Sequence, residues 1–270
     1  MGDTLRHMKS LRKYGKLIAL KANLYRPARA LHRRMCDAPF RKQLERIRRF
    51  YGGIIRSGDL VFDVGANVGT YSEIFASLGA QVVAVEPLPE NVAALHNCSY
   101  RKRIRVVEAA VGSEIGTGKI RRASSRTMAS MSRQFIEAAQ MNPRIQEHQV
   151  VWKDEIEVDV TTLDALARDY GSPDFIKVDV EGFEESVLDG LSEQPGYLSF
   201  EFTPGLLQAA KRCLAKSIIS PDSECNYIVG DPEQFVLDCW SDKDSLMRHL
   251  IASPPDLYGD IFVRRTGPHI

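Results

Sequence analysis

Residues 61–72 read VFDVGANVGTYS, and this stretch decides the fold class. A short apolar run enters a glycine-rich turn, and the turn opens a segment with a helical pattern. Gly65 and Gly69 allow the backbone to turn sharply and to approach a ligand closely. In open parallel sheets, ligands bind at the carboxyl ends of the strands, near a change in strand order. The stretch therefore predicts the first strand, turn and helix of a ligand-binding α/β domain.

Apolar runs and helical segments alternate through the rest of the chain. Predicted strands cover residues 60–64, 81–85, 104–107, 158–160, 175–178, 197–200, 227–229 and 261–264. Predicted helices cover residues 71–78, 90–97, 162–170, 183–191 and 241–251. Strands that alternate with helices favour βαβ units. About seven of these strands fit one sheet, so we predict a doubly wound, Rossmann-like α/β domain over residues 58–270, with a mostly parallel seven-stranded sheet.

The first 57 residues are predicted to form a basic helical extension, with Pro27 and Pro39 as breaks. Residues 1–50 carry 15 Lys or Arg and 3 Asp or Glu, a net charge of +12, whereas the remaining 220 residues have a net charge of −11. Such an extension could contact an anionic membrane surface, bind nucleic acid or pack on the acidic remainder in a homodimer. Nucleic acid is disfavoured, because the charges lack the interleaved aromatic residues of single-strand binders.

Residues 117–157 do not follow the alternation and are predicted to form an inserted lid or binding element. A helical stretch is predicted near residues 134–140, and the alternative for the insertion is a disordered surface loop. Four arginines could contact an anionic or hydroxyl-rich group, or simply be solvated; they are Arg121, Arg122, Arg126 and Arg133.

The composition is typical of a protein from a reducing compartment, and the sequence predicts no membrane span. The five cysteines show no metal-binding spacing. No apolar run reaches the roughly 18 residues of a membrane span, and charges interrupt the N-terminus where a signal peptide would be apolar. A cytoplasmic protein is expected, with residues 1–50 available for peripheral contact with the inner membrane surface.

The turn and its neighbouring acids point to a nucleoside ligand without phosphates. Asn67 stands where a dinucleotide-binding turn has its middle glycine, and the P-loop Lys-Ser/Thr pair is absent. Glu86 follows Gly65 by 21 residues, the place of an acid that binds a ribose diol. Asp63 and Asp179 would add two carboxylates, which favour a cationic ligand over a pyrophosphate. These properties match S-adenosylmethionine; alternatively, the acids cap helices or pair with lysine.

Six ordered motifs over residues 59–202 resemble the FkbM family of methyltransferases. They are DVGANVGTYS (63–72), AVEP (84–87), AAVGS (109–113), TTLDAL (161–166), FIKVDVEGFEESVL (175–188) and SFEF (199–202). The resemblance implies a class I methyltransferase fold, S-adenosylmethionine as cofactor, and methylation of a hydroxyl on a sugar, glycan or polyketide-like compound. It also implies a set of cofactor-binding residues: Asp63, Gly65, Ala66, Asn67, Gly69 and Tyr71 at the turn, Glu86 and Pro87 at the ribose, Ala110 and Val111 at the adenine, and Asp179 near the amino group.

Methyl transfer to a hydroxyl requires an aligned acceptor and a group that takes the proton. The candidates at predicted strand ends are Asp179, Glu181 and Glu201, and His148 in the insertion is a further candidate. Glu181 could instead stabilise the start of a helix, which is also the role predicted for Glu184 and Glu185. Three carboxylates would suit Mg²⁺, but their number alone does not predict a metal site.

Two other functions remain open. An RNA methyltransferase would use the basic extension, but residues 179–182 read DVEG where methylases of base nitrogens carry an Asn-Pro-Pro-aromatic motif. A non-catalytic scaffold that binds S-adenosylmethionine would be expected to have lost the glycine turn or the ribose acid, and the sequence retains both.

Overall fold

The computed structural model describes residues 38–124, 129–141, 150–203, 205–254 and 257–266. Within this part of the chain, seven strands form a sheet in the order β10-β11-β9-β8-β1-β2-β3. Their bounds are β1 Leu60–Val64, β2 Gln81–Val85, β3 Ile104–Val107, β8 Phe175–Val178, β9 Tyr197–Phe202, β10 Glu224–Tyr227 and β11 Gly259–Arg264. Five neighbouring strands are parallel, and β11 runs antiparallel to both β9 and β10. The predicted doubly wound, mostly parallel sheet is confirmed.

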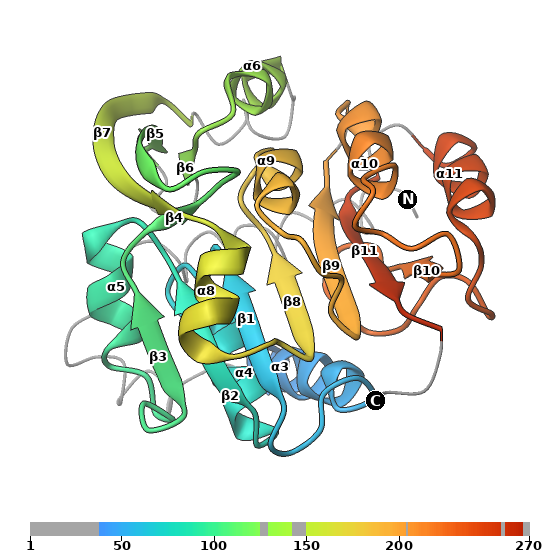
Figure 1. The fold of residues 1–270 in the computed structure, drawn as a ribbon, viewed down its shortest axis with the longest axis horizontal. Coiled ribbons are helices and arrows are strands. Elements are labelled where there is room, and N and C mark those ends of the chain that lie inside the picture. Colours follow the sequence, from blue (N-terminus) through green and yellow to red (C-terminus); the bar gives the residue numbers. More distant parts are fainter. Residues whose placement is uncertain (1–37, 125–128, 142–149, 204, 255–256, 267–270) are drawn as a thin grey trace.

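Helices cover both faces of this sheet (Figure 1). One face carries α3 (Ala38–Tyr51), α4 (Thr70–Ser77) and α5 (Pro89–Leu95). The other carries α8 (Leu163–Tyr170), α9 (Glu184–Asp189), α10 (Leu207–Leu214) and α11 (Lys243–Ile251). Successive strand residues contribute to opposite cores, as Val61 and Phe62 do in β1. Helix α10 was not predicted.

The predicted insertion is largely a second, four-stranded sheet in the order β4-β7-β5-β6. Its elements are β4 Ala110–Val111, β5 Gly116–Ala123, β6 Ala129–Ser130 and β7 Trp152–Thr161, with α6 at Arg133–Met141. The loop alternative is wrong for this part, and the predicted strand 158–160 is the end of β7, outside the large sheet. Ile120 and Val158 pack inward while charged neighbours face solvent, the usual pattern of a half-solvated antiparallel ribbon.

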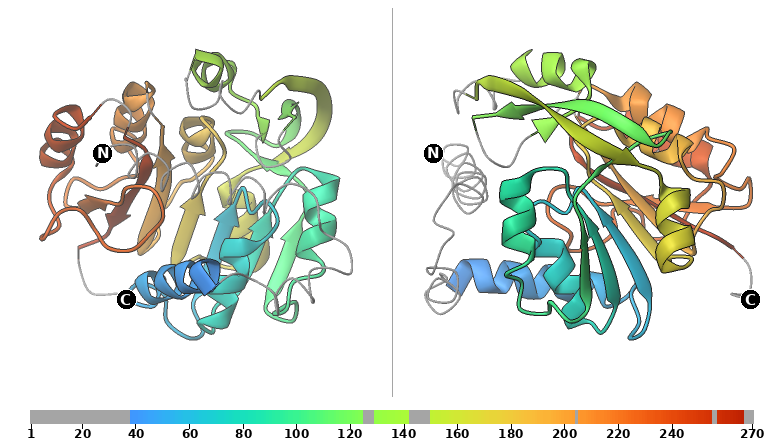
Figure 2. Two further views of the ribbon diagram at one scale, coloured as in Figure 1. Left: turned by 180° about the vertical axis from the view of Figure 1, so that it is seen from behind. Right: turned by 60° about the vertical axis from the view of Figure 1, so that its left-hand side comes forward.

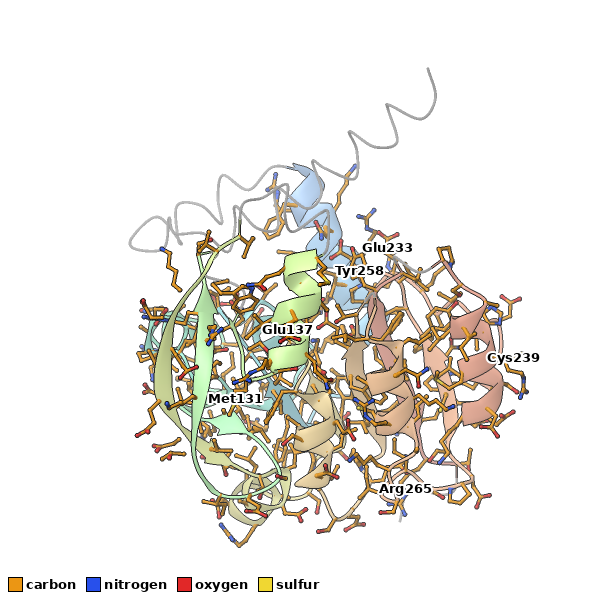
Figure 3. The ribbon with its side chains drawn as sticks, turned by 90° about the horizontal axis from the view of Figure 1, so that it is seen from above. Met131, Glu137, Glu233, Cys239, Tyr258 and Arg265 are labelled. Atoms are coloured by element: carbon orange, nitrogen blue, oxygen red, sulfur yellow. The ribbon has the colours of Figure 1, made fainter. Side chains whose placement is uncertain are left out.

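The small sheet and α6 lie beyond the carboxyl ends of the parallel strands (Figures 1 and 2). Seen from above, α6, which carries Glu137, lies between the small sheet and α10 (Figure 3). Met131 connects this region to the small sheet, because its side chain fills the space over Gly118. The insertion thus occupies the position expected of a lid.

Helix α3 packs into the core of the large sheet although it belongs to the predicted basic extension. Tyr51 is fully buried and contacts the rings of Phe75, Phe175 and Phe262. On the outer side, the Gln43 amide donates to Asp231 (2.7 Å). Pro39 belongs to α3, and the part of the predicted helical extension that precedes Ala38 lies outside the described residues. None of the helices in the described ranges is long and apolar enough to cross a membrane.

We expect Tyr51→Ala to lower the free energy of unfolding by about 3–5 kcal/mol, because it empties a large buried site. Tyr51→Phe should leave stability unchanged or raise it, since the Tyr51 hydroxyl is buried without a hydrogen-bond partner in the described part of the chain. Urea denaturation measures both, with the exposed Tyr100→Ala as control, which should cost under about 0.5 kcal/mol. A loss for Tyr51→Ala as small as the control's would mean that α3 does not stabilise the fold.

Candidate active site

The glycine turn after β1 brings the ends of β1, β2 and β8 together. Gly65 and Gly69 have φ of 80° and 86°, a region that glycine adopts without strain. A Cβ on Gly65 would lie 1.9 Å from the carbonyl oxygen of Asp179. The backbone N–H groups of Gly65 and Ala66 both donate to the carbonyl of Val85 at 3.0 Å. Glycine is therefore required at position 65 for β1 and β8 to approach this closely.

Glu86 fixes the other side of the turn. Its buried carboxylate accepts hydrogen bonds from the backbone N–H of Asn67 (2.8 Å), the backbone N–H of Leu88 (3.0 Å) and the side-chain amide of Asn91 (3.1 Å). Burial raises the pKa of Glu86, and these hydrogen bonds oppose the rise. The predicted ribose acid thus stands directly beside the turn, at the end of β2.

Below the turn, Lys177 is a buried cation in the middle of β8. Its Nζ donates to Oδ2 of Asp179 at 2.8 Å and lies 4.7 Å from the centre of the Tyr71 ring. Burial disfavours its charge, but the carboxylates of Asp179 and Asp260 outweigh burial and raise the pKa of Lys177. Lys177 therefore stays positive and holds one oxygen of Asp179. This agrees with the alternative prediction that the acids pair with lysine.

Asp63 lies beside Lys177 in the sheet register and is also buried. Its carboxylate accepts a hydrogen bond from Ser72 of α4 at 2.5 Å. Burial raises the pKa of Asp63, while Lys177 and Ser72 oppose the rise. Asp63 thereby ties the first turn of α4 to β1, and its predicted contact with the cofactor stays a prediction.

The loop Asp179–Gly182 is clamped from two sides. Glu181 has a left-handed backbone with φ of 56°, and its carbonyl accepts a hydrogen bond from Ser130 of β6 at 2.7 Å. A Cβ on Gly182 would lie 2.5 Å from Cβ of Phe135 in α6. Non-glycine residues with a left-handed backbone, such as Glu181, cluster at functional sites because the surrounding structure must hold them in that conformation. The insertion therefore positions the loop that carries two of the predicted catalytic acids.

Glu184 holds the same loop from the first turn of α9, as predicted. Its buried carboxylate accepts from the backbone N–H groups of Gly182 (3.0 Å) and Val180 (3.3 Å). Burial raises the pKa of Glu184 to about 7, against the opposing effect of these hydrogen bonds.

Glu201 lies near the end of β9, at the edge of the sheet that the carboxyl ends of the parallel strands form; we call this the carboxyl edge. The β8–β9 register runs to Val178 opposite Phe200, so Glu201 comes next to Asp179. Burial raises the pKa of Glu201, and the charges of Glu181, Asp179 and Glu184 raise it further. The structure thus brings together Asp179, Glu181 and Glu201, the three predicted acids from strand ends.

Other predicted residues have different outcomes. His148 and Arg126 lie outside the described residues. Arg121 and Arg122 are engaged with acids on neighbouring elements, at 3.5 Å to Glu155 and 3.0 Å to Asp154 respectively. Ala110 and Val111 form β4, which is buried, and their contact with a cofactor stays a prediction. No group of three or more His, Cys, Asp or Glu side chains in the described ranges is arranged to hold a metal ion.

Sequence reasoning missed two participants in this site. Asp260 in β11 pairs in register with Glu201, and burial raises its pKa to about 6. The charges of Asp260 and Lys177 both act on the pKa of the Tyr51 hydroxyl in α3. Lys177 could be recognised in the sequence, because it is a charged residue inside the apolar run FIKV. Asp260 and Tyr51 could not, because the sequence does not specify which elements pack beside β11 and α3.

A cavity of about 230 Å³ adjoins the loop on the side of α9 and α10. Its walls include Gly182 of the loop, Ser132 and Gln134 from the start of the α6 region, and Glu185 and Arg212 from the two helices. Glu185 and Arg212 bond to each other at 2.6 Å. The charges of Glu185 and Arg212 therefore offset each other within this wall.

We expect Glu184→Gln to flatten the dependence of stability on pH. An acid whose pKa is raised in the folded state keeps its proton there while the unfolded chain loses it, so stability falls as pH rises from about 4.5 to 7. Gln keeps an acceptor for the backbone N–H groups and does not ionise. The variant should match the wild type near pH 4.5 and exceed it by up to about 3 kcal/mol above pH 7. Urea denaturation across this range measures the difference, and a constant difference would contradict the assignment.

Comparison with known proteins gives a consistent family. The model of the methyltransferase FkbM domain matches residues 63–219. The 31-O-demethyl-FK506 methyltransferase FkbM of Streptomyces tacrolimicus is 32% identical over 165 residues, which cover 53% of this chain and 63% of that protein. The chain therefore matches less than two thirds of the relative's length.

Solved structures show a weaker likeness. Precorrin-6y C5,15-methyltransferase from Geobacter metallireducens is 12% identical, with a TM-score of 0.40 over 84% of this chain and 87% of that chain. An S-adenosylmethionine-dependent O-methyltransferase from Thermotoga maritima is also 12% identical, with a TM-score of 0.38 over 85% of this chain and 66% of that one. The assignment rests on the domain match, which covers more than half of the sequence: the chain belongs to the FkbM family of methyltransferases, with the class I α/β fold that its motifs imply.

Proposed function

We propose that this protein transfers a methyl group from S-adenosylmethionine to a hydroxyl oxygen of a sugar, glycan or polyketide-like compound. The observation that carries the proposal is the arrangement around the glycine turn. Glu86 is held beside the turn on one side, and the carboxylates of Asp179, Glu181 and Glu201 gather across from it at the ends of β8 and β9.

The chain's own residues suit this cofactor. Glu86 would accept hydrogen bonds from the ribose diol, because it stands at the end of the second strand next to the turn. Asp179 would face the amino group, and the surrounding carboxylates favour a ligand with ammonium and sulfonium charges. When bound, S-adenosylmethionine supplies an already activated methyl group. The protein must then align the acceptor and receive its proton.

The choice of a hydroxyl acceptor draws on the family and on the acids. The Streptomyces relative is, by its name, a methyltransferase for the 31-O position of a demethylated FK506. A carboxylate close to the acceptor is a suitable general base for an alcohol. By contrast, a polyanionic RNA would meet an acidic edge, and a non-catalytic scaffold would not need the clustered acids beyond the cofactor turn.

Calorimetric titration with S-adenosylmethionine tests the cofactor, with NAD⁺ in parallel. We expect binding of the methyl donor alone, and a loss of about 10- to 100-fold in affinity for Glu86→Ala, as for a hydrogen bond to a charged group. The matched control is Glu193→Ala, whose side chain is 82% exposed, and it should bind as the wild type does. Tight binding of NAD⁺, or no binding of S-adenosylmethionine, would refute the proposed function.

A further inference from the structure

The three acids of the carboxyl edge are not equivalent. Asp179 is occupied by Lys177 at 2.8 Å, and the Glu181 backbone is held by Ser130. Oε2 of Glu201 is buried, yet no hydrogen-bond partner for it occurs in the described part of the chain. Ser199, two residues earlier on the same side of β9, is fully buried and also leaves its hydroxyl unpartnered within the described residues.

A buried carboxylate oxygen without a partner is costly when charged. It becomes stable either by holding a proton or by accepting a hydrogen bond from a ligand. A hydroxyl group on an acceptor molecule is a donor of the required kind. Oε2 of Glu201 is therefore the atom on this edge to which an alcohol would donate the missing hydrogen bond.

The charges around Glu201 restrict what the acceptor can be. Asp179, Glu181, Glu184 and Asp260 all raise its pKa by their negative charge. Lys177 is the buried cation of the described chain, and Asp179 already engages it. Arg122 of the insertion is engaged elsewhere, with Asp154 and Glu90. The four acids would repel a phosphate or carboxylate on the acceptor, whereas they would not repel a neutral polyol.

We propose that the acceptor is an uncharged hydroxyl compound and that Glu201 takes its proton. This inference rests on the proposed function. The acceptor oxygen forms a bond to the methyl carbon while the carbon–sulfur bond breaks and its electron pair stays on sulfur. The hydroxyl proton passes to Oε2 of Glu201, which later returns it to water. Lys177 keeps Asp179 in its ion pair and so leaves the proton transfer to Glu201.

The raised basicity of Glu201 agrees with this role. A carboxylate with an ordinary pKa is a weak base toward an alcohol, and burial beside like charges is a common way to strengthen it. The rate of methyl transfer should consequently rise with pH as Glu201 loses its resting proton.

An infrared titration of the protein alone tests the state of Glu201. We expect the difference spectrum between the wild type and Glu201→Gln to contain a protonated-carboxyl band that persists well above the ordinary glutamate pKa of about 4.3. The other buried acids with a raised pKa, such as Glu184 and Asp260, are present in both proteins and cancel in the difference. The control Glu193→Gln removes an exposed acid and should leave the band intact. A spectrum of Glu201→Gln identical to that of the wild type, or titration of the band near pH 4.3, would overturn the proposal.

Methyl transfer tests the acceptor class. Tritiated S-adenosylmethionine would be supplied with methyl glucoside and a macrolide as neutral probes, and with glucose 6-phosphate and an RNA oligonucleotide as anionic probes. We expect transfer to a neutral probe only. Glu201→Gln should lower kcat/KM by about 10²- to 10⁴-fold and abolish its rise with pH, with unchanged affinity for the methyl donor. Preferential transfer to an anionic probe, or an unaltered pH profile in Glu201→Gln, would overturn the proposal.

Failure of the proposed function and failure of the role of Glu201 would give different experimental results. A wild-type protein that does not bind S-adenosylmethionine would refute the proposed function. The infrared titration requires neither methyl donor nor acceptor, so its result for Glu201 would stand independently.

Discussion

The site depends on the contact between Lys177 and Asp179. A lysine in the middle of a central strand must be neutralised, because an isolated ammonium inside a protein is very costly. The contact of 2.8 Å does this and fixes where the chain leaves β8. It also draws in Tyr71 of α4, whose ring lies 4.7 Å from the ammonium. Removing Asp179 would take this partner from a buried charge, which makes this edge of the sheet sensitive to small changes.

From this contact, a continuous set of close approaches spans the carboxyl edge. Gly65 admits the carbonyl of Asp179, and Glu86 holds the backbone of Asn67 on the far side of the same turn. On the other flank, Phe135 covers Gly182, and Ser130 bonds to Glu181. The insertion is consequently part of the site and not only a cover over it. Movement of α6 would directly displace the loop that carries Asp179 and Glu181.

The sequence predicted the parts of this site that local pattern controls. The glycine turn, the position of Glu86 and the strand before Asp179 follow from short-range signals, and the structure places them at one edge of the sheet. The small sheet escaped prediction because charged residues such as Arg121 and Glu155 alternate with few apolar ones, and so resemble a polar loop. Asp260 and the orphan oxygen of Glu201 depend on which strands become neighbours, and the sequence does not state that β11 lies beside β9.

A buried ion pair is weak support for stability, since a pair of apolar residues of similar size often serves as well or better. The presence of Lys177 is therefore better explained by the electrostatics of the site. Its charge offsets the acids that converge on this edge, and in the proposed reaction its pairing with Asp179 would remove one carboxylate from competition for the acceptor's proton. Without that pairing, Asp179 and Glu201 would be neighbouring like charges, and neither would have a defined role. The same lysine that makes the strand end costly to bury thus gives the three acids different chemistry.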